Sequence, residues 1–362
     1  MSVYAVVGDI GGAKEVFPAM QILQDKYGVT IKWFVDYSPK AKAGTEFLSK
    51  AGVSYESRNP ESSDRPRVIV VGTSATAVGS QIAWTNYGRE NNIPVIWVED
   101  LHGTGSVKNV RSVSPDLMVV IDEIAAYCTR AIRPELKIKV LGKPSFANLP
   151  LLIEKASEIR VAVRQELGLR KAFLVNCMFG GEPPERAWTQ VLELVKVINL
   201  SWICLKPGNI FVMCRFHPKH PDIEGLRSRT ACVFGSRFVD GSLIKDAQHA
   251  VIASDFLFSE YAANDQFTGL LAGIPVGTLL FPDDCEWRTD NRGYPGGVPP
   301  ILVGREEWGV DSIYKANKLV SLAIKYPMFV KETTENRAKP FRTLLKPGAA
   351  ERIASVIGDY LN

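Results

Sequence analysis

The sequence predicts an α/β protein with two doubly wound parallel sheets, and three observations support this prediction. Short apolar runs alternate with amphipathic helical segments from the first residues onward, and turns containing glycine and proline separate them. Strands that alternate with helices at this spacing are typical of a parallel sheet covered on both faces. The length of 362 residues allows two domains, each with its own hydrophobic core.

We assign residues 1–150 to the first domain. Its first strand is the apolar run 3–9, after which Gly11 and Gly12 turn the chain into an amphipathic helix that extends to about Tyr27. A polar loop then precedes the strongly β-branched strand 67–72. The other strands are predicted at residues 30–36, 54–58, 94–101, 116–121 and 137–141. The other helices are predicted at residues 40–51, 76–91 and 123–132.

We assign residues 151–340 to the second domain, because the proline-containing turns near residues 144 and 150 interrupt the chain there. A charged helix at 151–167 connects the two series. The strands that follow are predicted at residues 172–177, 210–214, 231–234, 255–258 and 274–280. The helices are predicted at residues 184–200, 242–253, 264–272 and 311–326. Residues 341–362 form a separate closing segment with a last helix at 349–360.

Composition and charge exclude several classes of protein. The net charge of +4 is too small to indicate nucleic-acid binding, but it suits anionic small molecules or contact with an anionic membrane surface. No apolar run reaches the roughly 18 residues of a membrane-spanning helix, and the N-terminus lacks the regions of a signal peptide. We therefore expect a cytoplasmic protein, with peripheral contact to the inner face of the membrane left open.

The cysteines and acidic residues do not predict a metal site. The six cysteines form no Cys-x-x-Cys pair, and most lie within apolar segments, so we expect buried thiols rather than disulfides or zinc ligands. Asp283 and Asp284 form an acidic pair, but no further ligands accompany them. We predict neither a metal ion nor a cofactor.

Three of the four histidines lie just past the ends of predicted strands: His102, His217 and His220. In an open α/β sheet, ligands bind beyond the carboxyl ends of the strands. Histidine is also the side chain whose pKa is most easily tuned for proton transfer near neutral pH. These positions, which occur in both halves of the chain, predict an enzyme with a site between two domains.

The segment Glu99-Asp-Leu-His-Gly-Thr-Gly-Ser106 is the most specific motif of the first half. A carboxylate from Glu99 or Asp100 can orient the His102 imidazole and raise its basicity, as general-base catalysis requires. We favour catalysis over a hydrogen-bonded surface histidine. Gly11 and Gly12 form either a tight structural turn or a loop that lines the acceptor or the donor site, and we favour the acceptor site among the two ligand sites. Their motif is not Gly-x-Gly-x-x-Gly, so it does not predict a dinucleotide site.

The second half contains three candidate phosphate-binding segments. Gly180 and Gly181 join a strand to a helix, either as a structural turn or as a backbone cradle for a diphosphate. The segment Arg215-Phe-His-Pro-Lys-His220 concentrates hydrogen-bond donors that suit phosphate oxygens, or it is a solvated basic loop. At the next strand end, four residues are candidates for phosphate or ribose binding or, as isolated residues, for helix capping: Ser259, Glu260, Asn264 and Thr268.

Together, these segments resemble the GT-B superfamily of nucleotide-sugar glycosyltransferases, which also contains UDP-N-acetylglucosamine 2-epimerases. The resemblance extends from Gly8-Asp-Ile-Gly-Gly12 to Lys346-Pro-Gly-Ala-Ala-Glu-Arg-Ile-Ala354. It implies two Rossmann-like domains that face a central cleft and a C-terminal helix that crosses back to the N-terminal domain. The segments His102-Gly-Thr104 and Arg215-Phe-His-Pro218 are most similar to CDP-glycerol glycerophosphotransferases and related capsule-polymer transferases.

The resemblance also implies roles for individual residues. His102 would assist deprotonation of the acceptor hydroxyl, while Arg215 and His217 would contact the donor diphosphate. Beyond the resemblance, we expect Arg215 and Lys219 to offset the charge of the leaving nucleotide. Two departures from the family pattern concern the nucleotide. Thr268 stands where relatives often have a carboxylate that binds the ribose, and Glu260-Tyr-Ala-Ala263 replaces an Asp-Tyr-Ser-Ser stretch.

These inferences predict a metal-independent transferase that uses a nucleotide-diphosphate sugar as donor. It would move a glycosyl or polyol-phosphate group to a hydroxyl of a glycan, polyol or lipid-linked acceptor during synthesis of a cell-envelope polymer. A nucleotide-sugar 2-epimerase that uses Glu99 or Asp100 for proton transfer is the first alternative. A non-catalytic nucleotide- or glycan-binding protein is the second.

Overall fold

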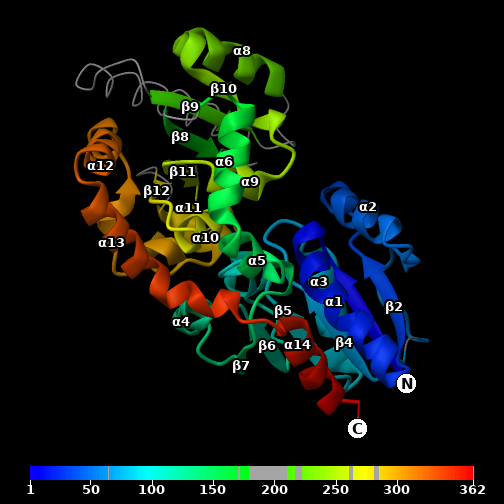
Figure 1. Cartoon of the computed structure of the whole chain (residues 1–362). Helices are drawn as coiled ribbons and strands as arrows, with labels where there is room; N and C mark the ends of the chain where they lie inside the picture. Colours follow the sequence, from blue (N-terminus) through cyan, green and yellow to red (C-terminus); the bar gives the residue numbers. More distant parts are fainter. Residues whose placement is uncertain are drawn as a thin grey trace. The chain divides into compact units, whose positions relative to one another are not determined.

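The computed structural model describes residues 1–63, 65–169, 172–178, 210–216, 222–260, 264–280 and 285–361 (Figure 1). They form two compact units. The first unit comprises Met1–Pro150, Asp283–Pro300 and Thr343–Asn362. The second comprises Leu151–Pro282 and Ile301–Arg342. The following description treats each unit by itself.

The first unit contains a seven-stranded sheet with the order β3-β2-β1-β4-β5-β6-β7, and all of its strand pairs are parallel. Its strands are β1 (Ser2–Val7), β2 (Thr30–Val35), β3 (Tyr55–Glu56), β4 (Val68–Gly72), β5 (Val95–Val98), β6 (Leu117–Val120) and β7 (Ile138–Val140). Its longer helices are α1 (Ile10–Tyr27), α2 (Lys42–Lys50), α3 (Gly79–Glu90), α4 (Glu123–Ile132), α11 (Cys285–Arg292) and α14 (Ala349–Asp359). The strand order reverses direction between β1 and β4, and ligands in such sheets bind at this switch point.

Backbone packing at the switch point requires glycine in two elements. A Cβ atom on Gly12 in α1 would lie 2.8 Å from the carbonyl oxygen of Gly72 in β4, and a Cβ on Gly72 would lie 2.6 Å from the carbonyl oxygen of Gly12. Asp9 caps α1, because its carboxylate accepts a hydrogen bond from the Gly12 amide at 3.1 Å. The first helix therefore starts directly against the sheet.

The C-terminal helix α14 belongs to the core of the first unit. It packs beside α1, and both chain ends lie in this unit (Figure 1). Ile353, Ala354 and Ile357 are buried in the same cluster as the apolar residues of α1 and β1. The expected return of the last helix to the N-terminal domain is confirmed.

The second unit contains a six-stranded sheet with the order β10-β9-β8-β11-β12-β13, again with all pairs parallel. Its strands are β8 (Phe173–Met178), β9 (Ile210–Arg215), β10 (Phe238–Asp240), β11 (Phe256–Glu260), β12 (Val276–Leu279) and β13 (Gly309–Val310). Its helices include α5, which begins at Leu149 (Leu149–Glu154), α6 (Ala156–Glu166), α8 (Ile223–Phe234), α9 (Ala247–Ile252), α10 (Asn264–Leu271), α12 (Ile313–Lys325) and α13 (Pro327–Ala338). The predicted fold class is confirmed.

Several predicted elements differ from the structure. Residues 231–234, predicted as a strand, are the last turn of α8, which Asp222 caps through the Gly225 amide. This short apolar run lies on a helix, where periodicity over four residues cannot distinguish the two states. The predicted helix 151–167 is two helices that meet at Lys155. Residues 285–300, predicted within the second domain, belong to the first unit.

Candidate active site

The carboxyl ends of β1, β4 and β5 bring Gly11, Thr73 and Asp100 together in the first unit. A Cβ on Gly11 would lie 2.4 Å from Asp100 Oδ2. The Asp100 carboxylate therefore fits beside the first turn of α1 only because Gly11 has no side chain. Thr73 Oγ1 donates to Asp100 Oδ1 at 3.3 Å, and the Leu101 amide donates to the same oxygen at 2.7 Å. The Gly11 turn and the strand end of Asp100 therefore form one site.

Asp100 is a buried carboxyl of this site whose charge changes with pH near neutrality. Its burial, together with the negative charge of Asp9, raises the pKa of Asp100 to about 7, while Lys143 opposes this shift. A carboxyl with a pKa near neutral pH can either accept or donate a proton. This environment supports an acid–base role for Asp100.

A buried ion pair between Lys143 and Glu15 lies next to Asp100. Lys143 Nζ lies 2.9 Å from Glu15 Oε1, and both side chains are about 2% exposed. The ammonium also donates to the carbonyl oxygen of Asp100, and Glu15 accepts hydrogen bonds from the backbone and hydroxyl of Ser145. This network joins α1, the end of β5 and the chain after β7.

His102 pairs with Asp122, which corrects the prediction that Glu99 or Asp100 orients it. Its Nε2 lies 2.9 Å from Asp122 Oδ2, and both side chains are at most 1% exposed. Burial opposes ionisation of Asp122, but His102 and the Ala125 amide outweigh it and hold the pKa of Asp122 below its usual range. The orienting carboxylate comes from the end of β6, because neighbouring strands of a parallel sheet end at the same edge.

Glu99 holds the backbone of the His102 loop. Its Oε1 accepts a hydrogen bond from the Gly103 amide at 2.8 Å, and its Oε2 accepts one from the Ile121 amide at 3.5 Å. Burial and the nearby Asp122 and Asp100 raise the pKa of Glu99 well above its usual range. In this geometry the Glu99 carboxylate holds the loop through backbone amides.

The segment 285–297 packs against the loop that carries His102. A Cβ on Gly293, whose φ is 67°, would lie 2.1 Å from the carbonyl oxygen of Gly103. Arg111 donates to the carbonyl oxygen of Thr289 at 2.8 Å, and Lys108 pairs with Asp290 at 2.8 Å. Backbone packing and ion pairs thus fix the His102 loop from a part of the chain nearly two hundred residues away.

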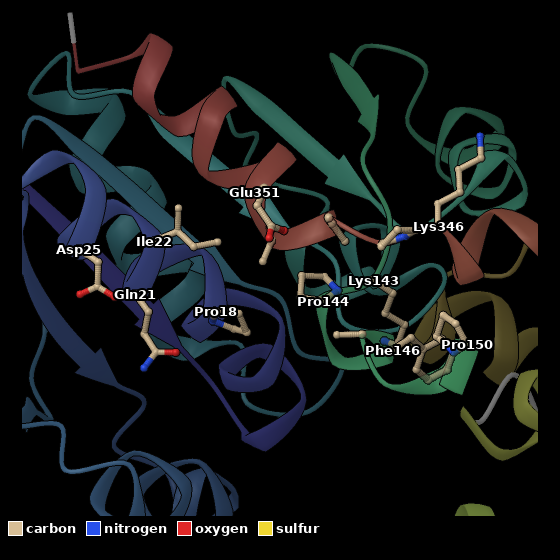
Figure 2. A pocket seen from close by; sticks show the side chains of 15 residues that line it. Pro18, Gln21, Ile22, Asp25, Lys143, Pro144, Phe146, Pro150, Lys346 and Glu351 are labelled. Carbon is tan, nitrogen blue, oxygen red and sulfur yellow. The ribbon is translucent and has the colours of Figure 1, made fainter. Parts of the chain in front are cut away.

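A cavity of about 430 Å³ lies beside the Lys143–Glu15 ion pair in the first unit. Figure 2 shows Pro18, Ile22 and Asp25 of α1 on one side of it. Lys143, Pro144 and Phe146 and the start of α14 supply other parts of its lining. Lys143 therefore borders the cavity while also contacting the backbone of Asp100.

Arg215 is the predicted phosphate-binding residue of the second unit that the structure describes most fully. It ends β9, and its Nη1 donates to the carbonyl oxygens of Gly241 at 2.8 Å and Ile244 at 2.6 Å. Removal from water raises the pKa of Asp265, at the start of α10, to about 6, and the positive charge of Arg215 opposes this shift. The guanidinium is anchored to the main chain at the carboxyl end of the sheet.

The other predicted residues of this unit have different environments. Ser259 and Glu260 end β11, and Asn264 is the exposed first residue of α10. Thr268 is fully buried, and its hydroxyl donates to the Asn264 carbonyl oxygen at 3.1 Å within the helix. Gly180, Gly181, His217 and Lys219 lie outside the described residues.

Sequence reasoning missed Lys143, Glu15 and Asp122. Asp122 follows a predicted strand directly, so the rule that selected His102 applies to it as well. Lys143 also follows a predicted strand, but its Gly-Lys-Pro context indicates only a turn. Glu15 lies on a helix, and no local pattern distinguishes it from a surface carboxylate.

Within the described ranges, no three His, Cys, Asp or Glu side chains are grouped in a way that could hold a metal ion. Among those same residues, no helix is both long and apolar enough to cross a membrane.

Comparison with known proteins gives similarity at the level of structure. No family model and no curated protein matches the sequence. Among solved structures, the UDP-GlcNAc 2-epimerase from Neisseria meningitidis bound to UDP-GlcNAc is 14% identical, with coverage of 100% of this chain and 99% of that one and a TM-score of 0.56. HepE from Anabaena in complex with UDP-glucose is 11% identical, with 99% coverage of both chains and a TM-score of 0.59.

The wall teichoic acid polymerase TagF is 12% identical, with coverage of 98% of this chain and 88% of that one and a TM-score of 0.51. The TM-scores above 0.5 and the coverage of at least 98% of this chain show a common fold. They do not transfer a substrate or a reaction.

Proposed function

We propose that this chain, which has the GT-B fold, is an enzyme that transfers a glycosyl or polyol-phosphate group from a nucleotide-diphosphate donor to a hydroxyl acceptor. The observation that carries the proposal is the buried Asp100 carboxyl, with a pKa of about 7, held over the Gly11 turn at the switch point of the first sheet. Deprotonation of a hydroxyl is the chemistry that such a group assists. The second proton-transfer candidate is His102, held by Asp122.

The donor is proposed to bind to the second unit. Arg215 is fixed by two carbonyl oxygens at the carboxyl end of β9, which pre-orients its guanidinium for a phosphate. Arg215, together with Lys219, would offset the charge that develops on the leaving nucleotide, so the expected transfer needs no bound metal. The solved structures of the Neisseria epimerase with UDP-GlcNAc and of HepE with UDP-glucose support a uridine nucleotide as the first donor to test.

Thermal denaturation of the full chain with UDP, CDP and GDP tests donor binding. We expect one nucleoside diphosphate to raise Tm, since a ligand that binds only the folded state stabilises it by mass action. If none raises Tm, the proposal of a nucleotide enzyme fails. That result would favour a non-catalytic glycan-binding protein.

A 2-epimerase is the second candidate function, and the neutral pKa of Asp100 favours it as well, since proton transfer at carbon 2 needs such a group. Incubation of UDP-sugars alone in deuterated water distinguishes the two. Deuterium at carbon 2 would contradict the transferase and support the epimerase. Release of UDP only when an acceptor alcohol is present would support the transferase.

The proton-transfer residue is tested with His102→Ala and Asp100→Asn. The variant that removes the base should reduce turnover by roughly 10²–10⁴-fold with donor affinity little changed. If turnover is unchanged in both variants, the strand-end site of the first unit is not the catalytic centre.

A further inference from the structure

The second unit exposes an apolar corner between α12 and α13. Helix α12 ends at Lys325, Tyr326 separates the two helices, and Pro327 is the first residue of α13. The residue before a proline disfavours the helical conformation, and proline suits a helix start. The corner leaves the side chains of Tyr326, Met328 and Phe329 exposed by 59%, 74% and 59%. Three large apolar side chains within four residues therefore face water.

Met328 and Phe329 lie outside the buried face of α13. The buried face of α13 consists of Val330, Thr334, Arg337 and Ala338, at the spacing of one helical stripe. Met328 and Phe329 precede this stripe. Exposed apolar side chains that gather in this way are typical of an interaction site.

Basic side chains accompany the corner. Tyr314, Lys318 and Lys325 are exposed on α12 at spacings of four and seven residues, which places them on one face of the helix. The stretch from Ser312 to Lys331 contains four lysines and no acidic residue. We call these six exposed residues of α12 and of the corner after it the corner patch: Tyr314, Lys318, Lys325, Tyr326, Met328 and Phe329.

The charge of the corner patch is not neutralised by its neighbours. Lys315 pairs with Asp311 and Lys331 with Glu335, at 2.6 Å and 4.0 Å. In the part of the chain that the structure describes, neither Lys318 nor Lys325 has an ion-pair partner. The exposed acidic residues of α13, Glu332 and Glu335, follow the corner by at least three residues.

We propose that the corner patch binds the surface of an anionic lipid bilayer. Met328 and Phe329 would enter the boundary between headgroups and acyl chains, the tyrosines would lie at the headgroup level, and Lys318 and Lys325 would contact lipid phosphates. A protein partner fits less well, because lysine is depleted in the cores of protein interfaces. This proposal goes beyond the proposed function and does not depend on its chemistry.

Vesicle sedimentation of the full chain tests the proposal. We expect binding to vesicles of phosphatidylglycerol and phosphatidylcholine in equal parts, little binding to phosphatidylcholine alone, and weaker binding at high salt. Replacing both Met328→Ser and Phe329→Ser should reduce the bound fraction at least about tenfold, because two apolar side chains lose their burial. Tyr127→Ser, at a position 54% exposed on α4, is the matched control and should bind like the wild type.

The charge contribution is tested separately. The double variant Lys318→Glu and Lys325→Glu should bind acidic vesicles far more weakly than the wild type. The double variant Lys40→Glu and Lys50→Glu is the control, because it changes the net charge by the same amount at exposed positions of the first unit, and it should bind far better than the first variant. Equal loss in both pairs would show a response to net charge alone and overturn the proposal. Failure of the wild type to bind acidic vesicles would also overturn it, as would a dimer that the Met328→Ser and Phe329→Ser variant dissociates. Circular dichroism confirms that each variant is folded.

Discussion

The two sheets of this protein have the same parallel construction, yet their carboxyl edges use polar side chains differently. At the edge of the first sheet, ionisable side chains bind one another: Lys143 pairs with Glu15, and His102 pairs with Asp122. At the edge of the second sheet, Arg215 and Thr268 donate to main-chain carbonyl oxygens. The described part of the first edge is therefore held by pairs of ionisable side chains, while Arg215 and Thr268 of the second edge are held by the main chain.

The largest expected effect tests the interdependence of the first edge. Lys143→Met leaves the Glu15 carboxylate buried without its cation and should reduce the free energy of unfolding by about 3–5 kcal/mol. Adding Glu15→Gln removes the unpaired charge and should restore much of that loss. Urea denaturation of the single and double variants measures both values. Equal stability of the two variants would show that the pair is not coupled.

Gly293→Ala tests the packing of segment 285–297 on the His102 loop of the first edge. Gly296→Ala is its matched control, because Gly296 has a similar φ of 58° but nothing within 4 Å of a Cβ. Both variants carry the backbone strain of a positive φ. The contact with Gly103 should cost Gly293→Ala about 1–3 kcal/mol more in unfolding free energy. Turnover of the folded Gly293→Ala protein should also fall.

Arg215→Ala tests how much the contacts between Arg215 and the main chain contribute to stability at the second edge. The variant loses two hydrogen bonds to carbonyl oxygens and should be less stable by about 1–2 kcal/mol. The effect should add to that of Lys143→Met, since the two sites share no partner. Lys245→Ala, an exposed cation of the same unit, should change stability by less than about 0.5 kcal/mol. Weaker binding of UDP by Arg215→Ala, but not by Lys245→Ala, would support the phosphate role.

A separate expected effect concerns pH. Because the pKa of Asp100 is raised from 3.8 to about 7 in the folded protein, the native state binds this proton more tightly than the unfolded chain. The stability that this proton contributes is complete below pH 3.8 and is lost as the pH rises towards 7. Asp100→Asn should therefore show a less steep decline of unfolding free energy over this range. An identical slope in wild type and variant would contradict the raised pKa.

The sequence predicted the architecture better than it predicted the contacts. Buried β-branched runs such as 67–72 identify strands of a doubly wound sheet, and strand ends identify the loops of Gly11, Asp100 and His102. The partner of His102 could not be inferred, because adjacent residues Glu99 and Asp100 point to other groups, whereas Asp122 arrives from the next strand. The spacing of apolar residues in a sequence predicts whether a segment is a helix or a strand. It does not predict which of several nearby carboxylates binds a histidine, because that depends on the direction of each side chain.

The place of α14 has a consequence for how the molecule is made. Ile353 and Ile357 fill the core formed by α1 and β1, although more than three hundred residues separate them in the chain. During synthesis from the N-terminus, the first unit cannot bury this surface until the last helix has left the ribosome. The second unit has its own cluster, which includes Leu174 and Met213, and all of its residues are synthesised earlier. We therefore expect the unit that begins the chain to be the last to finish folding.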